Sequence, residues 1–214
     1  MADIFREVDE EMRQENLQRI WSKYKVLIIA AVVALLAGTA GYVGWQEYTA
    51  RQRAAEAERF TAALTISGQE NAEQAIRDFG AIAGDARYGY AALASLEQAG
   101  LLAEAGDLQG AIAAYDALAA KSDVAQPFRD LAIVLAGYRR LEAGDAAGAT
   151  TSLSGLVGGN TPWRHLAREI SALAAEKQGN RAEARSQLRH LVDDTEAPAG
   201  VRARAAEMLQ ALPE

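Results

Sequence analysis

Apolar residues are distributed along this chain in two ways, and each predicts a different kind of helix. From Val26 to Trp45 the sequence VLIIAAVVALLAGTAGYVGW is apolar on every face and contains no charged residue and no proline. At a rise of about 1.5 Å per residue, a helix of this length covers roughly 30 Å, the thickness of the hydrocarbon core of a bilayer. Residues 26–45 are therefore predicted to form a transmembrane helix.

Two other interpretations of this segment stay open. A buried core helix is also apolar, but it usually carries an apolar stripe beside a polar one. A cleavable signal peptide would end at small residues such as Gly38, Thr39 and Ala40. The preceding 25 residues contain six acidic side chains, which is unlike the short basic region that opens a signal peptide.

The charges beside the span predict its orientation. Arg19, Lys23 and Lys25 precede the span, whereas Glu47 is the first charged residue after it. Because basic flanks tend to stay on the cytoplasmic side, the N-terminus is predicted to be cytoplasmic. In a Gram-negative bacterium, residues 46–214 would then lie in the periplasm and be held at the inner membrane by a single pass.

Residues 1–25 place apolar side chains at helical intervals, which predicts an amphipathic cytoplasmic helix. Its two apolar patches, around Val8 and around Trp21, are slightly out of register. The segment either lies on the membrane, docks on a partner, or simply leads the chain into the bilayer. Its acidic residues weaken attraction to a membrane surface.

The rest of the chain has the three- and four-residue spacing of amphipathic helices, and the pattern repeats. A polar residue recurs at separations of 36, 38 and 35 residues, which is typical of arrays of helical hairpins. An alanine follows it after four residues, a large apolar residue after eight, and another apolar residue after eleven. The four sets are Asn71, Ala75, Phe79 and Ile82; Asp107, Ala111, Tyr115 and Leu118; Asp145, Ala149, Leu153 and Leu156; and Asn180, Ala184, Leu188 and Leu191.

In three of the four copies, a glycine that can end one helix stands directly before an Asp or Asn that can start the next. Gly106, Gly144 and Gly179 are suited to the left-handed conformation that closes a helix, and the next residue is suited to cap the following one. The expected product is a series of tight antiparallel hairpins. The helices are predicted at residues 45–67, 71–83, 86–104, 108–120, 127–143, 146–157, 162–177, 181–192 and 199–212.

This arrangement resembles the tetratricopeptide repeat family over roughly residues 60–212. The small residue that the family carries in its first helix is matched by Ala99, Gly137 and Ala172. The aromatic residue expected three positions later is replaced by Leu102, Arg140 and Ala175. The predicted fold is therefore all-α, with a single N-terminal transmembrane helix followed by a solenoid of degenerate tetratricopeptide-like hairpins.

The whole layout also resembles the bacterial membrane-anchored tetratricopeptide-repeat-like family. That family includes the ancillary subunit of the Sec translocon, and its periplasmic repeats are associated with chaperone-like handling of exported proteins. The opening MADIFREVDEEMRQENLQRIWSKYK supports the resemblance. It implies a protein partner, namely the translocon or its exported clients.

Residues capable of chemistry are sparse. The absence of cysteine excludes disulfides, thiolate metal sites and a cysteine nucleophile. His165 and His190 have no second ligand at helical spacing, so both are expected to be ordinary surface or helix-edge residues. No phosphate-binding loop or nucleophile elbow is present. We therefore expect no catalytic, cofactor-binding or metal site, and the net charge of −7 argues against a nucleic-acid partner.

The expected function is that of a protein-interaction scaffold tethered to the membrane, because stacked hairpins offer an extended surface. The residues expected to bind a partner lie in the first helices of the middle repeats: Tyr88, Tyr90, Leu93, Arg129, Ile133, Arg139 and Arg140. A second candidate surface is basic, namely Arg181, Arg185 and Arg189. This arginine stripe either meets an acidic partner or is a solvated helix face with nearby acids such as Glu183 and Glu169.

An alternative function is that of a structural or assembly subunit of another inner-membrane complex. In that case the transmembrane helix itself makes the main contact. Gly38, Gly41 and Gly44 recur every three residues and would allow another helix to approach closely. An enzyme is the least supported class, since no set of catalytic residues is apparent.

Overall fold

The structure is a computed structural model that describes residues 2–68, 71–87 and 89–212, with the backbone alone for residues 2–20. Within these ranges every regular element is an α-helix, which confirms the predicted all-α class. The chain divides into two compact units, Met1–Ala54 and Ala55–Glu214.

Helix α1 (Ala2–Ser67) carries the apolar segment and continues into the second unit. Between Trp21 and Ser67, an 18-residue window has a mean hydropathy of 2.4 and contains no buried residue. This length and composition are compatible with a single-pass membrane anchor and also with a signal sequence. The amphipathic pattern predicted for residues 1–25 falls mostly on side chains outside the described set, so their docking stays a prediction.

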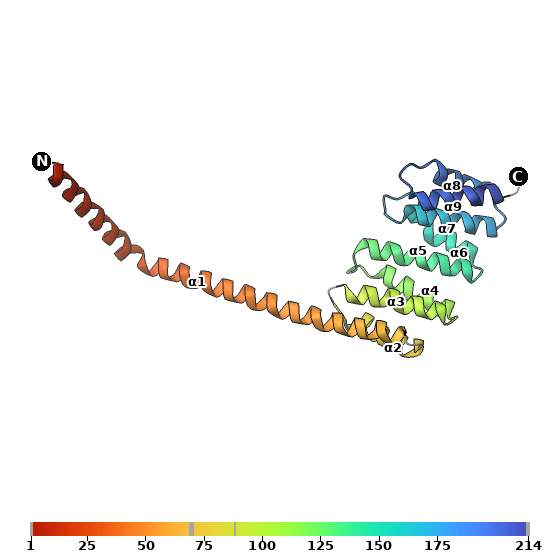
Figure 1. Cartoon of the computed structure of the whole chain (residues 1–214), viewed down its shortest axis with the longest axis horizontal. Coiled ribbons are helices and arrows are strands. Elements are labelled where there is room, and N and C mark those ends of the chain that lie inside the picture. The colour runs from red at the N-terminus through yellow and green to blue at the C-terminus, as the bar shows by residue number, and fades with distance from the viewer. Residues whose placement is uncertain (1, 69–70, 88, 213–214) are drawn as a thin grey trace. The chain divides into compact units, whose positions relative to one another are not determined.

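The second unit is an array of helical hairpins closed by a single helix (Figure 1). We call the leading helix of each hairpin its first helix and the following one its second helix. The first hairpin consists of residues 55–67 of α1 and helix α2 (Ala72–Asp85). The remaining elements are α3 (Tyr90–Glu104), α4 (Leu108–Ala120), α5 (Gln126–Glu142), α6 (Ala146–Val157), α7 (Arg164–Lys177), α8 (Arg181–Asp193) and the closing helix α9 (Ala199–Ala211).

These bounds agree with the predicted helices to within a few residues, except at the start of α3 and at the helix predicted for residues 45–67, which is continuous with the apolar segment in α1. The sequence predicted that α3 begins at residue 86, but it begins at Tyr90. Gly89 precedes it with φ of +93°, and Ala86 is extended, so the chain turns before the helix starts. The apolar spacing extends backward across this turn, which explains the error.

The helices form two layers that pack differently. Each helix from α2 to α9 packs on its neighbour in sequence, and first helices also contact one another: α3 with α5, α5 with α7, and α7 with α9. Across the described residues, no comparable contact joins the second helices α2, α4, α6 and α8. The second helices are therefore spaced apart. Each first helix packs against the second helices on both sides of it, as α7 does against α6 and α8 (Figure 1).

The joints between helices form as predicted in three copies. The glycine of each joint has a positive φ, between +75° and +87°. In the first of these joints the amide of Asp107 donates to the carbonyl of Leu102 at 2.9 Å, which closes α3. The carboxylate of Asp107 also accepts from the amide of Gly110 at 2.8 Å, which caps α4. The same pair of bonds recurs at Asp145 and at Asn180.

The first copy departs from this pattern. Asn71 makes no side-chain hydrogen bond to the start of α2. The physical reason is the position of its glycine. Gly68 stands three residues before Asn71, whereas the glycine in the other copies comes directly before the capping residue. The tight reversal that aims the capping side chain at the next helix is therefore missing.

The repeated apolar positions form the core, as predicted. All four repeated alanines are 0% exposed, and the large residue one turn later is at most 2% exposed in every copy. Gly137 shows why the first helix needs a small residue at this place. A Cβ atom on Gly137 would lie 2.9 Å from the Cγ atom of Leu153, closer than real side chains pack.

Buried polar side chains tie successive hairpins together. Asp130 of α5 is 4% exposed, and its carboxylate accepts from the hydroxyl of Thr161, ahead of α7, at 2.6 Å. Glu169 of α7 is 5% exposed and accepts two bonds from Arg204 of α9, at 2.6 and 2.8 Å. Each buried carboxylate is thus satisfied by a partner from a later part of the chain.

The joint geometry predicts how two capping positions respond to substitution. Asp145→Ala is expected to lower the free energy of unfolding by about 1 kcal/mol, because the amide of Gly148 loses its partner. Urea unfolding of the full chain in detergent, followed by far-ultraviolet circular dichroism, measures this change. Asn71→Ala is the matched control and should cost much less, since this side chain caps nothing. Equal losses in both variants would contradict the assignment.

Candidate interaction surfaces

The residues predicted to bind a partner are distributed over different faces of the array. Tyr88 lies outside the described residues. The ring of Tyr90 packs on Phe60, with ring centroids 5.7 Å apart, so this side chain contributes to the core of the first hairpin. Leu93, further along α3, is 36% exposed and accessible to a partner.

Three of the predicted residues share the side of α5 that faces the second helices. Arg129, Ile133 and Arg140 are spaced by four and seven residues, which places them on one helical face. Arg140 forms an ion pair with Asp116 of α4. Ile133 packs on the apolar cluster that contains Leu156 of α6. This face of α5 is therefore largely occupied by contacts within the array.

The opposite side of α5 is the more open one. Tyr138 is 44% exposed there, and Leu131, seven residues earlier on the same face, is partly exposed. The predicted residue Arg139 lies beside Tyr138, with its guanidinium 5.2 Å from the ring centroid and an ion pair to Glu142 at 2.7 Å. Sequence reasoning missed Tyr138, although an aromatic residue away from the buried stripe of α5 was a usable signal.

The predicted arginine stripe is only partly available. Arg185 donates to the carbonyl of Leu212 at 2.7 Å, so it caps the end of α9. Arg181 and Arg189 are exposed, and among the described residues neither forms an ion pair. The acids expected beside the stripe have other partners: Glu169 pairs with Arg204, and Glu183 accepts from a glutamine of its own helix.

His165 differs from the expected surface histidine because it is buried, with an exposed fraction of 7%. Its Nε2 atom lies 2.9 Å from the carboxylate of Asp194, in the loop after α8. The pKa of Asp194 is lowered, first by the hydrogen bond from the amide of Glu196 and then by the bond with His165. Among the described residues, no three metal-binding side chains cluster together.

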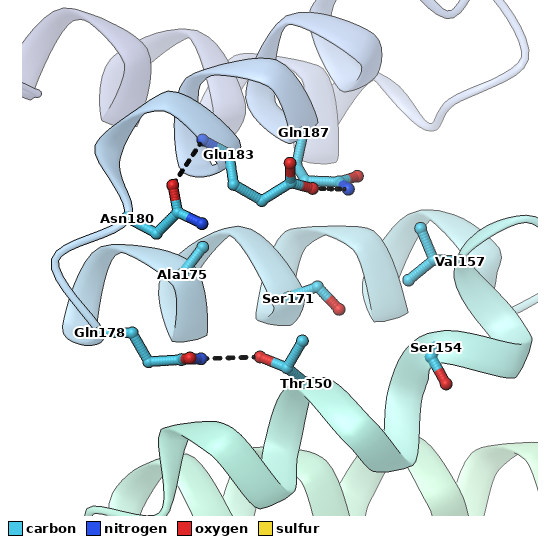
Figure 2. A pocket seen from close by; sticks show the side chains of 9 residues that line it. All are labelled: Thr150, Ser154, Val157, Ser171, Ala175, Gln178, Asn180, Glu183 and Gln187. Atoms are coloured by element: carbon cyan, nitrogen blue, oxygen red, sulfur yellow. Dashed lines mark hydrogen bonds between the residues drawn. The ribbon is translucent and has the colours of Figure 1, made fainter.

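A polar hollow of about 270 Å³ lies between the second helices α6 and α8, with α7 as its floor (Figure 2). We call it the α6–α8 hollow. Its main lining residues are Thr150 and Ser154 from α6, Ser171 and Ala175 from α7, and Glu183 and Gln187 from α8. The predicted partner-binding residues do not line it.

Ala175 leaves this hollow open. It stands three residues after the small Ala172, where the tetratricopeptide repeat family carries an aromatic side chain. In the preceding copy the same position is Arg140, whose long side chain reaches Asp116 of α4. The side chain of alanine ends at Cβ, so this position of α7 sends no long side chain into the space between α6 and α8. The degeneracy noted in the sequence therefore has a direct structural result.

Comparison with known proteins identifies the family of this chain. Residues 18–154 match the family described as tetratricopeptide repeat-like domain. The matched range includes the apolar segment of α1 and the hairpins as far as α6, which is more than half of the chain. The chain therefore belongs to this family. No curated protein and no solved structure matched it. Membership suggests a protein-interaction scaffold, and repeats of this type are typically not catalytic.

Single-cysteine variants test which faces of the array are accessible, because the chain has no cysteine of its own. Leu93→Cys and Tyr138→Cys are expected to react with a maleimide nearly as fast as the unfolded chain. Val134→Cys is the control, since Val134 lies on the same helix as Tyr138 but is 0% exposed. Its labelling requires local opening and should be at least about tenfold slower. Equal rates at all three positions would contradict the packing of α5.

Proposed function

We propose that this member of the tetratricopeptide repeat-like family is a scaffold, tethered to the inner membrane of a Gram-negative bacterium, that holds a protein partner. The tether is residues 26–45, residues 1–25 are cytoplasmic, and residues 46–214 lie in the periplasm. The observation that carries the proposal is the continuity of α1. The helix that contains the apolar segment also supplies the first helix of the array.

The contacts of α1 with the array support this tether. Phe60 of α1 packs edge-on against Phe79 of α2, with ring centroids 5.4 Å apart. The carboxylate of Glu56 accepts from the amide of Arg87 at 2.9 Å, and Arg59 pairs with Asp85. The array is thus built directly on the helix that follows the apolar segment. Tethering of this kind raises the local concentration of the array around its partner.

The partner we propose is the Sec translocon or the exported proteins that leave it, toward which the array acts as a chaperone-like accessory. The resemblance of the layout to the bacterial membrane-anchored family supports this choice. The exposed side chains of Leu93 and Tyr138 offer apolar contact area for a partner in an otherwise acidic domain. The basic residues Arg181 and Arg189 offer a second, charged contact.

A second candidate function is that of an assembly subunit held mainly through its transmembrane helix. Gly38, Gly41 and Gly44 favour it, because they recur every three residues and carry no side chain. Their surfaces are open to close approach by another helix. In this alternative the array would position the subunit but would not capture the partner.

The proposed topology predicts the behaviour of reporter fusions. A reporter that is active only in the periplasm is expected to be active when fused after Glu214, and inactive when fused after Lys25. The protein isolated from membranes should keep the full mass of 22.8 kDa, because an anchor is not removed. A cytoplasmic C-terminus would overturn the proposed orientation. A shortened chain beginning near Ala40 would identify the apolar segment as a signal peptide.

Site-specific crosslinking in cells distinguishes the two candidate functions. A photoreactive residue at position 93 or 138 is expected to capture a translocon subunit or an exported protein, whereas one at Arg77 on the second helix α2 should not. The crosslinks are then compared with those of a chain whose residues 26–45 are replaced by an unrelated span. Crosslinks that persist favour capture by the array. Their loss, with the protein still in the membrane, favours assembly through the native span.

A further inference from the structure

We propose that the α6–α8 hollow binds a basic segment of the partner protein, with one arginine side chain inserted over α7. The inference rests on the proposed function, since it assumes that the array binds a protein, and it adds the chemistry that the array selects. The hollow lies between the second helices α6 and α8, and neither Leu93 nor Tyr138 lines it. It is therefore a separate contact site.

Ser171 points to a missing ligand in this hollow. Its side chain lies on the face of α7 that is turned to the hollow (Figure 2), and the residue is 7% exposed. Its hydroxyl oxygen is buried and has no hydrogen-bond partner. By contrast, Ser154 on the opposite wall donates to the carbonyl of Thr151 at 2.8 Å. A buried hydroxyl without a partner destabilises the fold, and a bound polar group would satisfy it.

The remaining polar groups present mostly hydrogen-bond acceptors. The amide nitrogen of Gln178 donates to the hydroxyl of Thr150 at 2.9 Å, which leaves its oxygen available. The amide nitrogen of Gln187 donates to Glu183 at 2.6 Å, and its oxygen is likewise left (Figure 2). Glu183 alone is charged among the described residues that line the hollow. The charged Glu183 and the free oxygens therefore favour a donor-rich cation, although Asn180, Gln187 and Ser171 each keep a donor as well.

An arginine side chain matches these features. Its guanidinium carries five N–H donors and a permanent positive charge, whereas an acidic segment would be repelled by Glu183. Its aliphatic stem would pack on Val157 and Ala175, the apolar part of the lining. At about 270 Å³ the hollow is smaller than typical small-molecule sites, which span roughly 300–1,000 Å³. This size suits one long side chain and the backbone beside it.

The preceding hairpin contains an internal precedent. Arg140 occupies the position that corresponds to Ala175, and its guanidinium extends toward α4, where it pairs with Asp116. Asp116 corresponds in turn to Ser154 of α6, which lines the hollow. One copy of the repeat thus fills the space with its own arginine. The next copy has alanine at this position and an open space above it, so a guanidinium from another chain would take the place of the arginine side chain.

The test measures binding of labelled peptides to the full chain in detergent by fluorescence anisotropy. The probe is a heptapeptide Gly-Ala-Ser-Arg-Ser-Ala-Gly, compared with peptides that carry lysine or the neutral isostere citrulline in place of arginine. The arginine peptide is expected to bind at least about tenfold more tightly than the citrulline peptide, since charged hydrogen bonds add this much. Tightest binding of the citrulline peptide would overturn the proposal.

Variants of the chain locate the binding site. Glu183→Gln is expected to weaken binding of the arginine peptide about tenfold. Ala175→Arg should abolish it, because the new side chain fills the hollow as Arg140 does in the preceding copy. Glu176→Gln is the matched control: it removes the same charge from an exposed position of α7 that does not line the hollow, and it should leave binding unchanged. Unchanged affinity in both hollow variants would overturn the proposal.

Ser171→Ala adds a readout that does not depend on a destabilised fold. It is expected to raise the melting temperature, since an unsatisfied buried hydroxyl is removed, and to weaken the arginine peptide about threefold. Unchanged affinity would remove Ser171 from the site and count against the proposal. The arginine site and the scaffold function are tested by different results. If Ala175→Arg leaves the crosslinks from positions 93 and 138 intact but no variant alters peptide binding, the arginine site is wrong and the scaffold function stands. If the native chain gives no crosslinks, the scaffold function itself fails.

Discussion

The array depends on one local arrangement, a glycine in the left-handed conformation followed by a residue that serves two helices at once. At Asp107, Asp145 and Asn180, the backbone amide closes the first helix and the side chain caps the second. Only three residues separate the two helices at each of these joints, so the chain reverses sharply. In these three copies the reversal brings the fully buried Ala111, Ala149 and Ala184 against the first helix. The hairpin therefore packs in nearly the same way each time.

Regular hairpins produce a regular spacing, and the spacing creates the places where the copies differ. First helices contact one another while second helices stand apart, so a space with a helical floor lies between successive second helices. The residue three positions after the small residue of the first helix decides what fills that space. Arg140 spans it and pairs with Asp116, whereas Ala175 leaves it open. The departure of these positions from the repeat pattern thus gives successive hairpins different surfaces.

A scaffold of this kind works through position and surface. The array offers two kinds of surface, the exposed apolar side chains of Leu93 and Tyr138 and the polar α6–α8 hollow. Two weak contacts on one array bind an extended chain more strongly than either contact alone. The acidic composition of residues 46–214 agrees with a preference for basic segments in such a chain.

The sequence by itself determined the helices, the three working joints and the buried alanines, because each depends on hydrogen bonds or apolar spacing within a few residues. It failed at the start of α3, where the chain turns at Gly89 before the helix begins. Only the tertiary structure decided which polar side chains meet, since Arg140 with Asp116 and His165 with Asp194 are 24 and 29 residues apart. It also decided that Tyr90 is buried against Phe60 and that a hollow opens over Ala175. These outcomes depend on how separate hairpins stack, which no single stretch of sequence records.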